Sequence, residues 1–596
     1  MEAHEKGLVI NIISNNKTLL RIPVYQRNYS WNEEQCKILL DDVEKIMTSG
    51  REHFFGTMVY VNLDSSERSE NLDSEYIIID GQQRITTIII LLKALYDSAK
   101  ERGDENICYD INDILYNRYC PDDYRIKLKS SNSDFAQFEA LLNNNREFLN
   151  ESGRIFQNYN ICLSRVQEWL NNNYFFTKIL AAIKKLKVVA IEMNKDDDQQ
   201  AIFESLNSTG LNLSNADLIR NFLLMKESPS RQKILFDNWQ VIERNLKADE
   251  SDEDINNFFM HYITFISGSV KEINKKILYR RFVDLFDDRN LTRSEIISEL
   301  KHLSGIYSAF VNKDSKKKYP AEIMKYLDDL RFLNQSTCYP FLLHVFNDYE
   351  NGIIDSKTLA KTVKFILCYI VRRLICKVSS GSLRGFFAGL YSRVFKIPDN
   401  KRKYYESINK FISIQISNDA LPSDERLKDY LLNQDIYGKN NALCKFILRE
   451  IENGGTKECL VFDDLTIEHI MPQKLTPEWR RIFSPEEHTK YLHTLGNLTI
   501  TGHNPELSNK SFLEKVRLIQ EKAKAKILNS DVINKSTWTA EDIKSRAERL
   551  AKIVINLFSA EKINDPDIKF DDLTKITLDD FSTVTYKVLD SFVFDG

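Results

Sequence analysis

A glutamate and a histidine stand side by side at Glu468 and His469, within the segment LTIEHIMPQ. A neutral histidine can take a proton from water, because its ordinary pKa lies near neutral pH. A carboxylate supplies the hard oxygen that Mg²⁺ prefers, and such an ion neutralises charge that develops on a phosphate. Asn504 and Asn509 stand near the start of an expected closing helix and offer a second ligand. The pattern therefore predicts metal-dependent hydrolysis of a phosphodiester, with His469 as the general base.

Two short strands and a helix must position these groups. Neighbouring residues of a strand point to opposite faces, so Glu468 and His469 converge on one phosphate only if the strand ends or twists there. A strand–strand–helix turn provides this, and Asn497, in a Gly-Asn-Leu segment, is expected to fix the turn that holds His469. The alternative is a core histidine beside a surface glutamate. Pro472 and Gln473, after two intervening residues, and then the Gly-Asn-Leu segment and Asn504 in this order, favour the nuclease interpretation.

A second polar cluster interrupts the apolar run YIIIDGQQRITTIIILLKAL, residues 76–95. The uninterrupted β-branched residues at its start predict a buried strand, and the later apolar residues follow helical spacing. The DGQQR segment, residues 80–84, thus lies where a strand ends and a helix begins. Free backbone N–H groups and the helix dipole favour an anion such as phosphate at such a junction. The alternative is an Asp-Gly turn with solvated glutamine and arginine side chains.

Length and composition limit the possible classes. A chain of 596 residues should hold several domains, and its net charge of −4 means that any DNA-binding surface is local. Nine cysteines without a C-x-x-C pair indicate reduced core residues and argue against zinc ribbons. No apolar run is long enough to span a membrane, and the start has no secretory signal pattern, so we expect a cytoplasmic protein.

The remaining segments suggest how the chain is organised. A helix is expected after RIPVYQRNYSW, with Ser30 and Glu33 as its capping box. Residues 101–184 suggest a helical insertion, and KLKVVAIEM a further strand. Residues 199–224 suggest two helices around a loop, with Ser214 and Asp217 capping the second. A strand-like run precedes LTIEHIMPQ, amphipathic helices fill most of the middle, and the acidic tail suggests a small β-rich appendage.

Several motifs together resemble one known family. IPVYQRNYSW, FFGTMV, DGQQRITT and FESLNSTGLNLSNADLIRN look like the ParB-like N-terminal domain of the GmrSD-type, modification-dependent (type IV) restriction endonucleases and their relatives SspE and BrxU. IEHIMPQ and LGNLTITGHNPELSNKSFLEK look like the HNH partner domain. The wider HNH class usually has Asp before the base histidine, where this chain has Glu468, and many of its members carry zinc cysteines that are missing here.

The resemblance implies an α+β chain in four parts. These are a ParB/sulfiredoxin-like nucleotide-binding domain with a helical insertion over 1–225, a helical middle over 226–400, a ββα-metal (HNH) nuclease within a helical domain over 401–562, and an appendage over 563–596. DGQQR would bind or hydrolyse an NTP, GTP or ATP, and Arg84 suits phosphate through bidentate hydrogen bonds. The residues that the resemblance assigns to nucleotide are Tyr25, Gln26, Arg27, Asp80, Gly81, Gln82, Gln83, Arg84 and Thr86.

The function implied is a nucleotide-regulated DNA endonuclease of anti-phage defence that uses Mg²⁺ or another divalent cation. Its substrate would be double-stranded, modified phage DNA, and its assembly, a homodimer or otherwise, stays open. One alternative is a low-specificity nicking or RNA-cleaving toxin nuclease. Another is an NTP-switched DNA-binding protein without cleavage. Because one chain carries both motifs, we expect nucleotide to change the cleavage rate, with a sign that the sequence leaves open.

Overall fold

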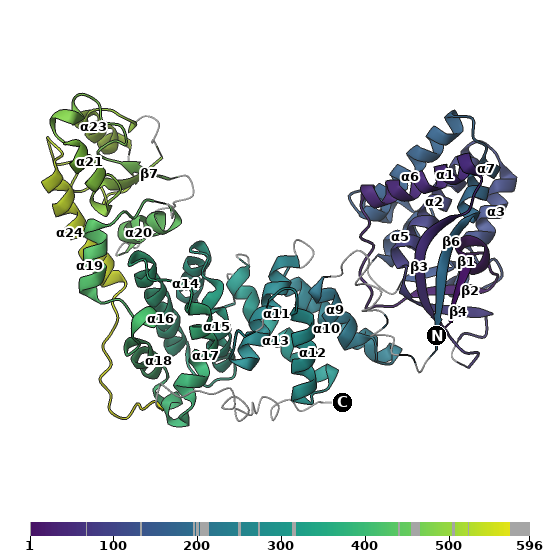
Figure 1. Cartoon of the computed structure of the whole chain (residues 1–596), viewed down its shortest axis with the longest axis horizontal. Coiled ribbons are helices and arrows are strands. Elements are labelled where there is room, and N and C mark those ends of the chain that lie inside the picture. Colours follow the sequence, from purple (N-terminus) through teal and green to yellow (C-terminus); the bar gives the residue numbers. More distant parts are fainter. Residues whose placement is uncertain are drawn as a thin grey trace. The chain divides into compact units, whose positions relative to one another are not determined.

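The computed structural model describes residues 2–66, 68–130, 134–194, 197, 202, 214–247, 252–271, 274–312, 318–438, 441–454, 465–502, 507–522 and 524–571. The chain divides into two compact units (Figure 1), Met1–Val241 with Phe286–Ser298, and Ile242–Leu285 with Glu299–Gly596. Helices dominate both units and the first also contains a sheet, so the α+β prediction is confirmed. Within the described residues, no helix is both long enough and apolar enough to cross a membrane.

The described part of the first unit contains a mixed sheet with the strand order β1-β6-β3-β4-β2-β5. The strands are β1 (Glu2–Gly7), β2 (Thr18–Ile22), β3 (His53–Asn62), β4 (Ser74–Asp80), β5 (Leu128–Ser130) and β6 (Leu186–Met193). Strand β4 contains the predicted strand before DGQQR, and it pairs antiparallel to β3 and parallel to β2. The prediction of a purely helical insertion was wrong in one place, because β5 lies inside it and pairs with β2.

Helices grouped beside the sheet complete the first unit (Figure 1). They include α1 (Glu33–Ser49), α2 (Gln82–Glu101), α3 (Glu105–Leu115), α5 (Phe135–Leu142), α6 (Arg154–Asn171) and α7 (Phe176–Lys184). Their apolar faces and the inner face of the sheet form one continuous core. The predicted capping box of α1 was wrong by two residues. The side chain of Asn32 accepts from the backbone N–H of Gln35, and the side chain of Gln35 accepts from the backbone N–H of Asn32. Asparagine is as good a cap as serine, and the helix does not begin until Glu33.

The helix α9 (Asn215–Leu224) begins as predicted. The side chain of Ser214 accepts from the backbone N–H of Asp217, and the side chain of Asp217 accepts from the backbone N–H of Ser214. These two bonds confirm the predicted capping box. The first helix of that predicted pair falls mostly on residues 198–201 and 203–213, outside the described residues.

The second unit consists mainly of helices, as expected for the middle of the chain. Its described helices before the nuclease motif include α11 (Asp252–Ser267), α14 (Ala321–Phe332), α15 (Tyr339–Glu350), α16 (Ser356–Ile375), α17 (Leu383–Phe395), α18 (Tyr404–Ser413), α19 (Asp424–Asn433) and α20 (Asn441–Asn453). The paired arginines that interrupt the most apolar run, Arg372 and Arg373, lie buried in α16 and donate to backbone carbonyls of neighbouring segments.

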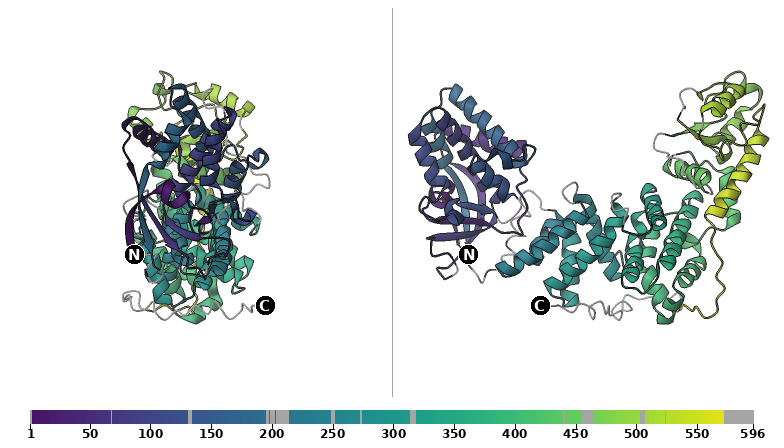
Figure 2. Two further views of the ribbon diagram at one scale, coloured as in Figure 1. Left: turned by 90° about the vertical axis from the view of Figure 1, so that its right-hand side faces the viewer. Right: turned by 180° about the vertical axis from the view of Figure 1, so that it is seen from behind.

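The nuclease motif lies on a small hairpin in the second unit. Strand β7 (Thr466–His469) pairs antiparallel with β8 (Leu498–Thr501), and α21 (Pro485–Tyr491) and α23 (Phe512–Lys522) accompany them. The long helix α24 (Ala540–Leu557) lies alongside α19 and α20, as Figure 1 and the right-hand view of Figure 2 show. The predicted strand-like run at 455–464 and the β-rich tail from 572 onward lie outside the described residues.

Candidate functional site

Glu468 and His469 are the last two residues of β7, opposite Thr499 and Leu498 of β8. The strand ends at His469, which is the condition under which the two side chains need not diverge. Glu468 is only 5% exposed and His469 only 3%. A buried Glu-His pair differs from the alternative of a core histidine beside a surface glutamate, because this carboxylate also lies inside the protein.

Asn497 holds the chain immediately after His469. Its side-chain oxygen accepts from the backbone N–H of Met471 at 2.7 Å, and its amide nitrogen donates to the carbonyls of Met471 at 3.0 Å and Leu492 at 2.9 Å. Its own carbonyl accepts from the N–H of Ile470 at 2.9 Å. These four bonds leave the turn after His469 little freedom.

Arg546, on α24, supports the turn that contains Asn497. Its fully buried guanidinium donates to the carbonyls of Leu495 at 3.2 Å, Gly496 at 2.7 Å and Leu498 at 2.9 Å. The approach is so close that a Cβ at Gly496 would lie 2.1 Å from the carbonyl oxygen of Ile543. Arg546 is not among the residues predicted from the sequence, although an arginine on the apolar face of an amphipathic helix indicates a buried partner.

Both ring nitrogens of His469 have neighbours. Nε2 lies 3.0 Å from Nδ1 of His493, and Nδ1 lies 3.3 Å from the amide nitrogen of Gln473. The ring of Tyr437 meets the His469 ring edge-on at 4.7 Å between centroids. Burial, aided by the nearby His493 and Lys515, lowers the pKa of His469 to about 3. The side chain is therefore neutral near physiological pH, and a pKa this low makes it a weak base in the protein without substrate.

The carboxylate of Glu468 is paired with Lys515 of α23, a residue that the sequence analysis did not single out. The ammonium nitrogen lies 2.6 Å from Oε1 of Glu468 and also donates to the carbonyl of His469 at 2.7 Å. The Lys515 side chain is only 1% exposed. Burial raises the pKa of Glu468 and lowers the pKa of Lys515, while each charge favours ionisation of the other. The pair thus balances charge inside the hairpin.

The predicted metal ligands are only partly described. Asn504 falls in residues 503–506, outside the described residues, and Asn509 is described and exposed. Within the described part of the chain, no three His, Cys, Asp or Glu side chains gather as a metal site. Glu468 fits a magnesium ion in chemical type, since it offers a hard oxygen. Any ion that it held would share the carboxylate with Lys515.

The DGQQR segment lies at the predicted junction, between β4 and α2. Gly81, at φ 97°, is the residue before the helix and carries no side chain to cap it. The first turn of α2 therefore presents backbone N–H groups at its N-terminal end, the polarity that favours an anion.

The two glutamines of the segment point into the protein. Gln82 donates to the side-chain oxygen of Gln26 at 3.1 Å and to the carbonyl of Arg27 at 3.3 Å. Gln83 accepts from the N–H of Ser30 at 2.8 Å and donates to the carbonyl of Asn28 at 3.1 Å. These bonds fasten the RIPVYQRNYSW segment to the start of α2, so sequence motifs that stand apart in the chain meet here.

The charged residues of the segment are more accessible. Arg84 donates to the carbonyl of Thr57 at 2.8 Å and lies 3.8 Å from a carboxylate oxygen of Asp80. The side chain of Arg84 is 30% exposed and that of Asp80 is 28% exposed. Arg27 is half-buried, whereas Tyr25 and Thr86 are buried. The structure thus gathers all nine predicted nucleotide residues around one junction but exposes only some of them.

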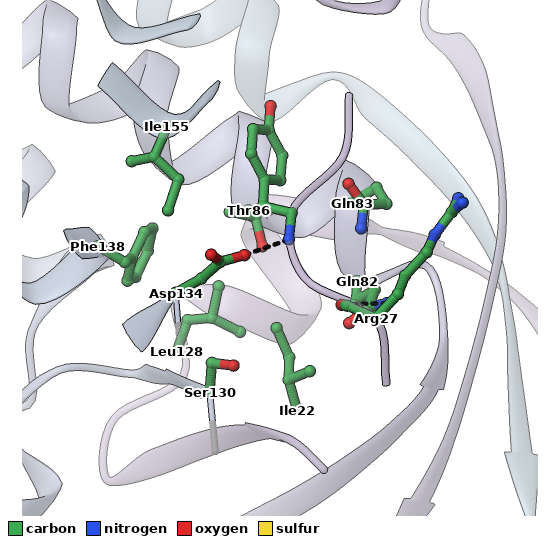
Figure 3. Close-up of a pocket in the computed structure, with 11 residues that line it drawn as sticks. Ile22, Arg27, Gln82, Gln83, Thr86, Leu128, Ser130, Asp134, Phe138 and Ile155 are labelled. Atoms are coloured by element: carbon green, nitrogen blue, oxygen red, sulfur yellow. Dashed lines mark hydrogen bonds between the residues drawn. The ribbon is translucent and has the colours of Figure 1, made fainter. Parts of the chain in front are cut away.

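A small cavity opens beside this junction (Figure 3). Ile22, Leu128, Phe138 and Ile155 line its apolar side, and Asp134 accepts from the backbone N–H of Tyr29 at its edge. Its volume of about 20 Å³ has room for roughly one water molecule. The cavity is therefore too small to hold a nucleotide.

Two family models match the chain. The model described as "GmrSD restriction endonuclease, N-terminal domain" matches residues 9–224, and "GmrSD restriction endonucleases, C-terminal domain" matches residues 421–553. No curated protein matches it. The first match contains the DGQQR junction, and the second contains β7, β8 and the residues around His469. The pair defines the class, a restriction endonuclease that acts on DNA. The chain belongs to the GmrSD family of these enzymes.

Proposed function

We propose that this restriction endonuclease is of the HNH type, cleaves modified double-stranded phage DNA and is regulated by nucleotide. The observation that carries the proposal is the placement of His469: its side chain is buried beside Glu468 at the end of β7, and the bonds of Asn497 hold the turn that follows it. Its Nδ1 faces Gln473, which is exposed, so this nitrogen lies on the side from which a water molecule can arrive.

The residues of the hairpin divide the work of hydrolysis. His469 takes the proton of the attacking water, which makes the oxygen a better nucleophile. Asn497 keeps the backbone around His469 in place. Glu468 would hold a divalent cation together with Asn504 or Asn509, and that cation would neutralise charge that develops on the phosphate. Lys515 keeps the Glu468 carboxylate ionised and oriented.

At the other junction, we assign the accessible residues to the nucleotide. Arg84 and Arg27 supply positive charge beside the first turn of α2, and Asp80 lies within reach of Arg84. Gln82, Gln83 and Gln26 shape the site instead, because their side chains are buried in bonds to the protein. Nucleotide bound here would change the rate of cleavage at His469 if it prefers one arrangement of the chain over another.

The nuclease part is tested with His469→Ala and modified and unmodified phage DNA, each with and without Mg²⁺ and NTP. We expect no cleavage by this variant and unchanged DNA binding, because only the base is removed. His302→Ala, a half-buried histidine hydrogen-bonded to Asn347 in the helical part, is the matched control and should cut normally. Cleavage by His469→Ala at the wild-type rate would refute the assignment. Equal cutting of both DNAs would favour a low-specificity nuclease.

The nucleotide part is tested by calorimetry with Arg84→Ala and Asp80→Ala. We expect weaker NTP binding in both, because each removes a charged group at the junction. Arg118→Ala, which removes an arginine paired with Asp113 on the surface of the same unit, should bind as the wild type does. Unchanged NTP affinity in both junction variants would count decisively against a phosphate site. If NTP binding weakens in these variants but nucleotide still changes the cleavage rate as in the wild type, the junction binds nucleotide but does not control cleavage.

A further inference from the structure

His493 lies directly behind the proposed base and has no assigned role so far. It precedes the short 3-10 helix Leu495–Asn497 and is half-buried. Its ring stacks on Tyr437 at 5.2 Å between centroids, with planes 14° apart. Its backbone carbonyl accepts from the N–H of Ile436 at 3.1 Å. The loop between α19 and α20 therefore fixes both the ring and the backbone of His493.

The hydrogen bonds around His469 determine where its proton lies. The Gln473 amide nitrogen can only donate, so Nδ1 of His469 must accept and carries no hydrogen. A neutral imidazole has one N–H, so Nε2 of His469 carries the hydrogen and donates to Nδ1 of His493 at 3.0 Å. In turn, His493 must carry its own hydrogen on Nε2.

We propose that His493 is a positioning residue, which holds His469 in the Nε2–H tautomer, so that Nδ1 carries no hydrogen and can accept a proton from a water molecule that takes the place of the Gln473 amide. This inference rests on the proposed role of His469 as the base. A neutral imidazole has two tautomers, and only the one with a bare Nδ1 can act on the exposed side. The acceptor on His493 selects that tautomer and fixes the plane of the ring. Asn497 does not do this, because its side chain bonds to backbone groups of the turn and not to the His469 ring.

Two substitutions separate an acceptor from a packing role. His493→Asn removes the stacking ring but keeps an acceptor, because its Oδ1 is bonded to Cγ just as Nδ1 is. His493→Phe keeps a ring for Tyr437 but has no acceptor. Partners that orient metal-bound histidines typically contribute about 10–100-fold to metal affinity or activity, and we take the same scale for the partner of His469. We expect His493→Phe to lower kcat by about that factor with KM unchanged, and His493→Asn to retain most of the wild-type kcat. The opposite order, with Phe active and Asn impaired, would show that His493 only packs.

A spectroscopic measurement on the full chain tests the tautomer without any DNA substrate. In protein labelled with ¹⁵N-histidine, the His469 signals are assigned by their loss in His469→Gln. We expect an Nε2–H pattern in the wild type and in His493→Asn, and a shift toward mixed tautomers in His493→Phe. An unchanged His469 pattern in His493→Phe would overturn the inference. If His469→Ala still cleaves, the proposed function fails; if it is inactive while His493→Phe cuts normally, only the positioning role fails.

Discussion

Replacing Lys515 by methionine should destabilise the nuclease hairpin strongly. The substitution keeps the length of the side chain but removes the ammonium that lies 2.6 Å from Glu468 Oε1. The carboxylate would then remain buried, at 5% exposure, without its counter-charge. Breaking a buried ion pair by removing one partner costs about 3–5 kcal/mol. The loss of the bond to the carbonyl of His469, at 2.7 Å, adds to this cost and loosens the end of β7.

The loss should depend on pH in a defined direction. Burial already raises the pKa of Glu468, and Lys515 opposes that rise. Without Lys515 the folded pKa rises further above the unfolded value. Below the unfolded pKa, the carboxyl is protonated in both states and the variant loses little. Above the folded pKa, the folded state holds an unpaired carboxylate and the loss is complete. The stability difference from the wild type should therefore be small near about pH 4 and largest near about pH 8.

Amide hydrogen exchange in metal-free buffer measures this locally, from peptides that cover β7 and α23. Lys535→Met is the matched control, because Lys535 pairs with Asp542 at the surface and its loss should leave the exchange nearly unchanged. Adding Glu468→Gln to Lys515→Met should recover much of the protection, since no charge is then left buried. A Lys515→Met protein as protected as the wild type at both pH values would refute the buried-pair argument, and so would a loss that is the same at both.

Two further substitutions test the supports of the two sites. Arg546→Met should lower the stability of the hairpin by at least about 3 kcal/mol and reduce cleavage, because it leaves several buried carbonyls unpaired. Arg549→Met, which removes a half-exposed pair with Asp531, should have neither effect. Hydrogen exchange of β8 distinguishes the two variants. Gln83→Leu should lower the free energy of unfolding by roughly 1–3 kcal/mol for each backbone N–H that it leaves unpaired in the segment before α1. Gln137→Leu, at the surface, should change it little. Thermal melts of the full chain measure both effects.

Local patterns in the sequence predicted the elements that carry chemistry. The β-branched run before DGQQR is a strand, the run after it is a helix, and Ser214 caps α9 as its spacing indicates. The strand β5 was missed because three residues give too short a pattern to distinguish from a loop. The cap of α1 was misplaced because Ser30 and Asn32 offer the same chemistry two positions apart, and tertiary packing decides between them.

The partners of each site could not be predicted in the same way. Three side chains contact the turn around His469 from distant positions in the chain. His493 lies 24 positions from His469, Lys515 lies 47 positions from Glu468, and Arg546 lies 51 positions from Leu495. No periodicity relates such positions, because the contacts follow from how the helices pack on the hairpin. The sequence showed that polar residues cluster, but not which of them turn inward.

Burial separates the residues that build these sites from those left for chemistry. Gln82, Gln83 and Asn497 are conspicuous polar residues of their motifs, yet each forms hydrogen bonds to backbone groups of a neighbouring segment, and Gln82 also bonds to the side chain of Gln26. Arg84 and Gln473 remain accessible at the rims of the same segments. A buried amide that bonds to a loop holds that loop in one position and so fixes the direction of the neighbouring side chain. The amides of these motifs are therefore expected to control geometry, so that their loss should impair both sites through disorder, while loss of the rim residues should impair binding or proton transfer in a folded protein.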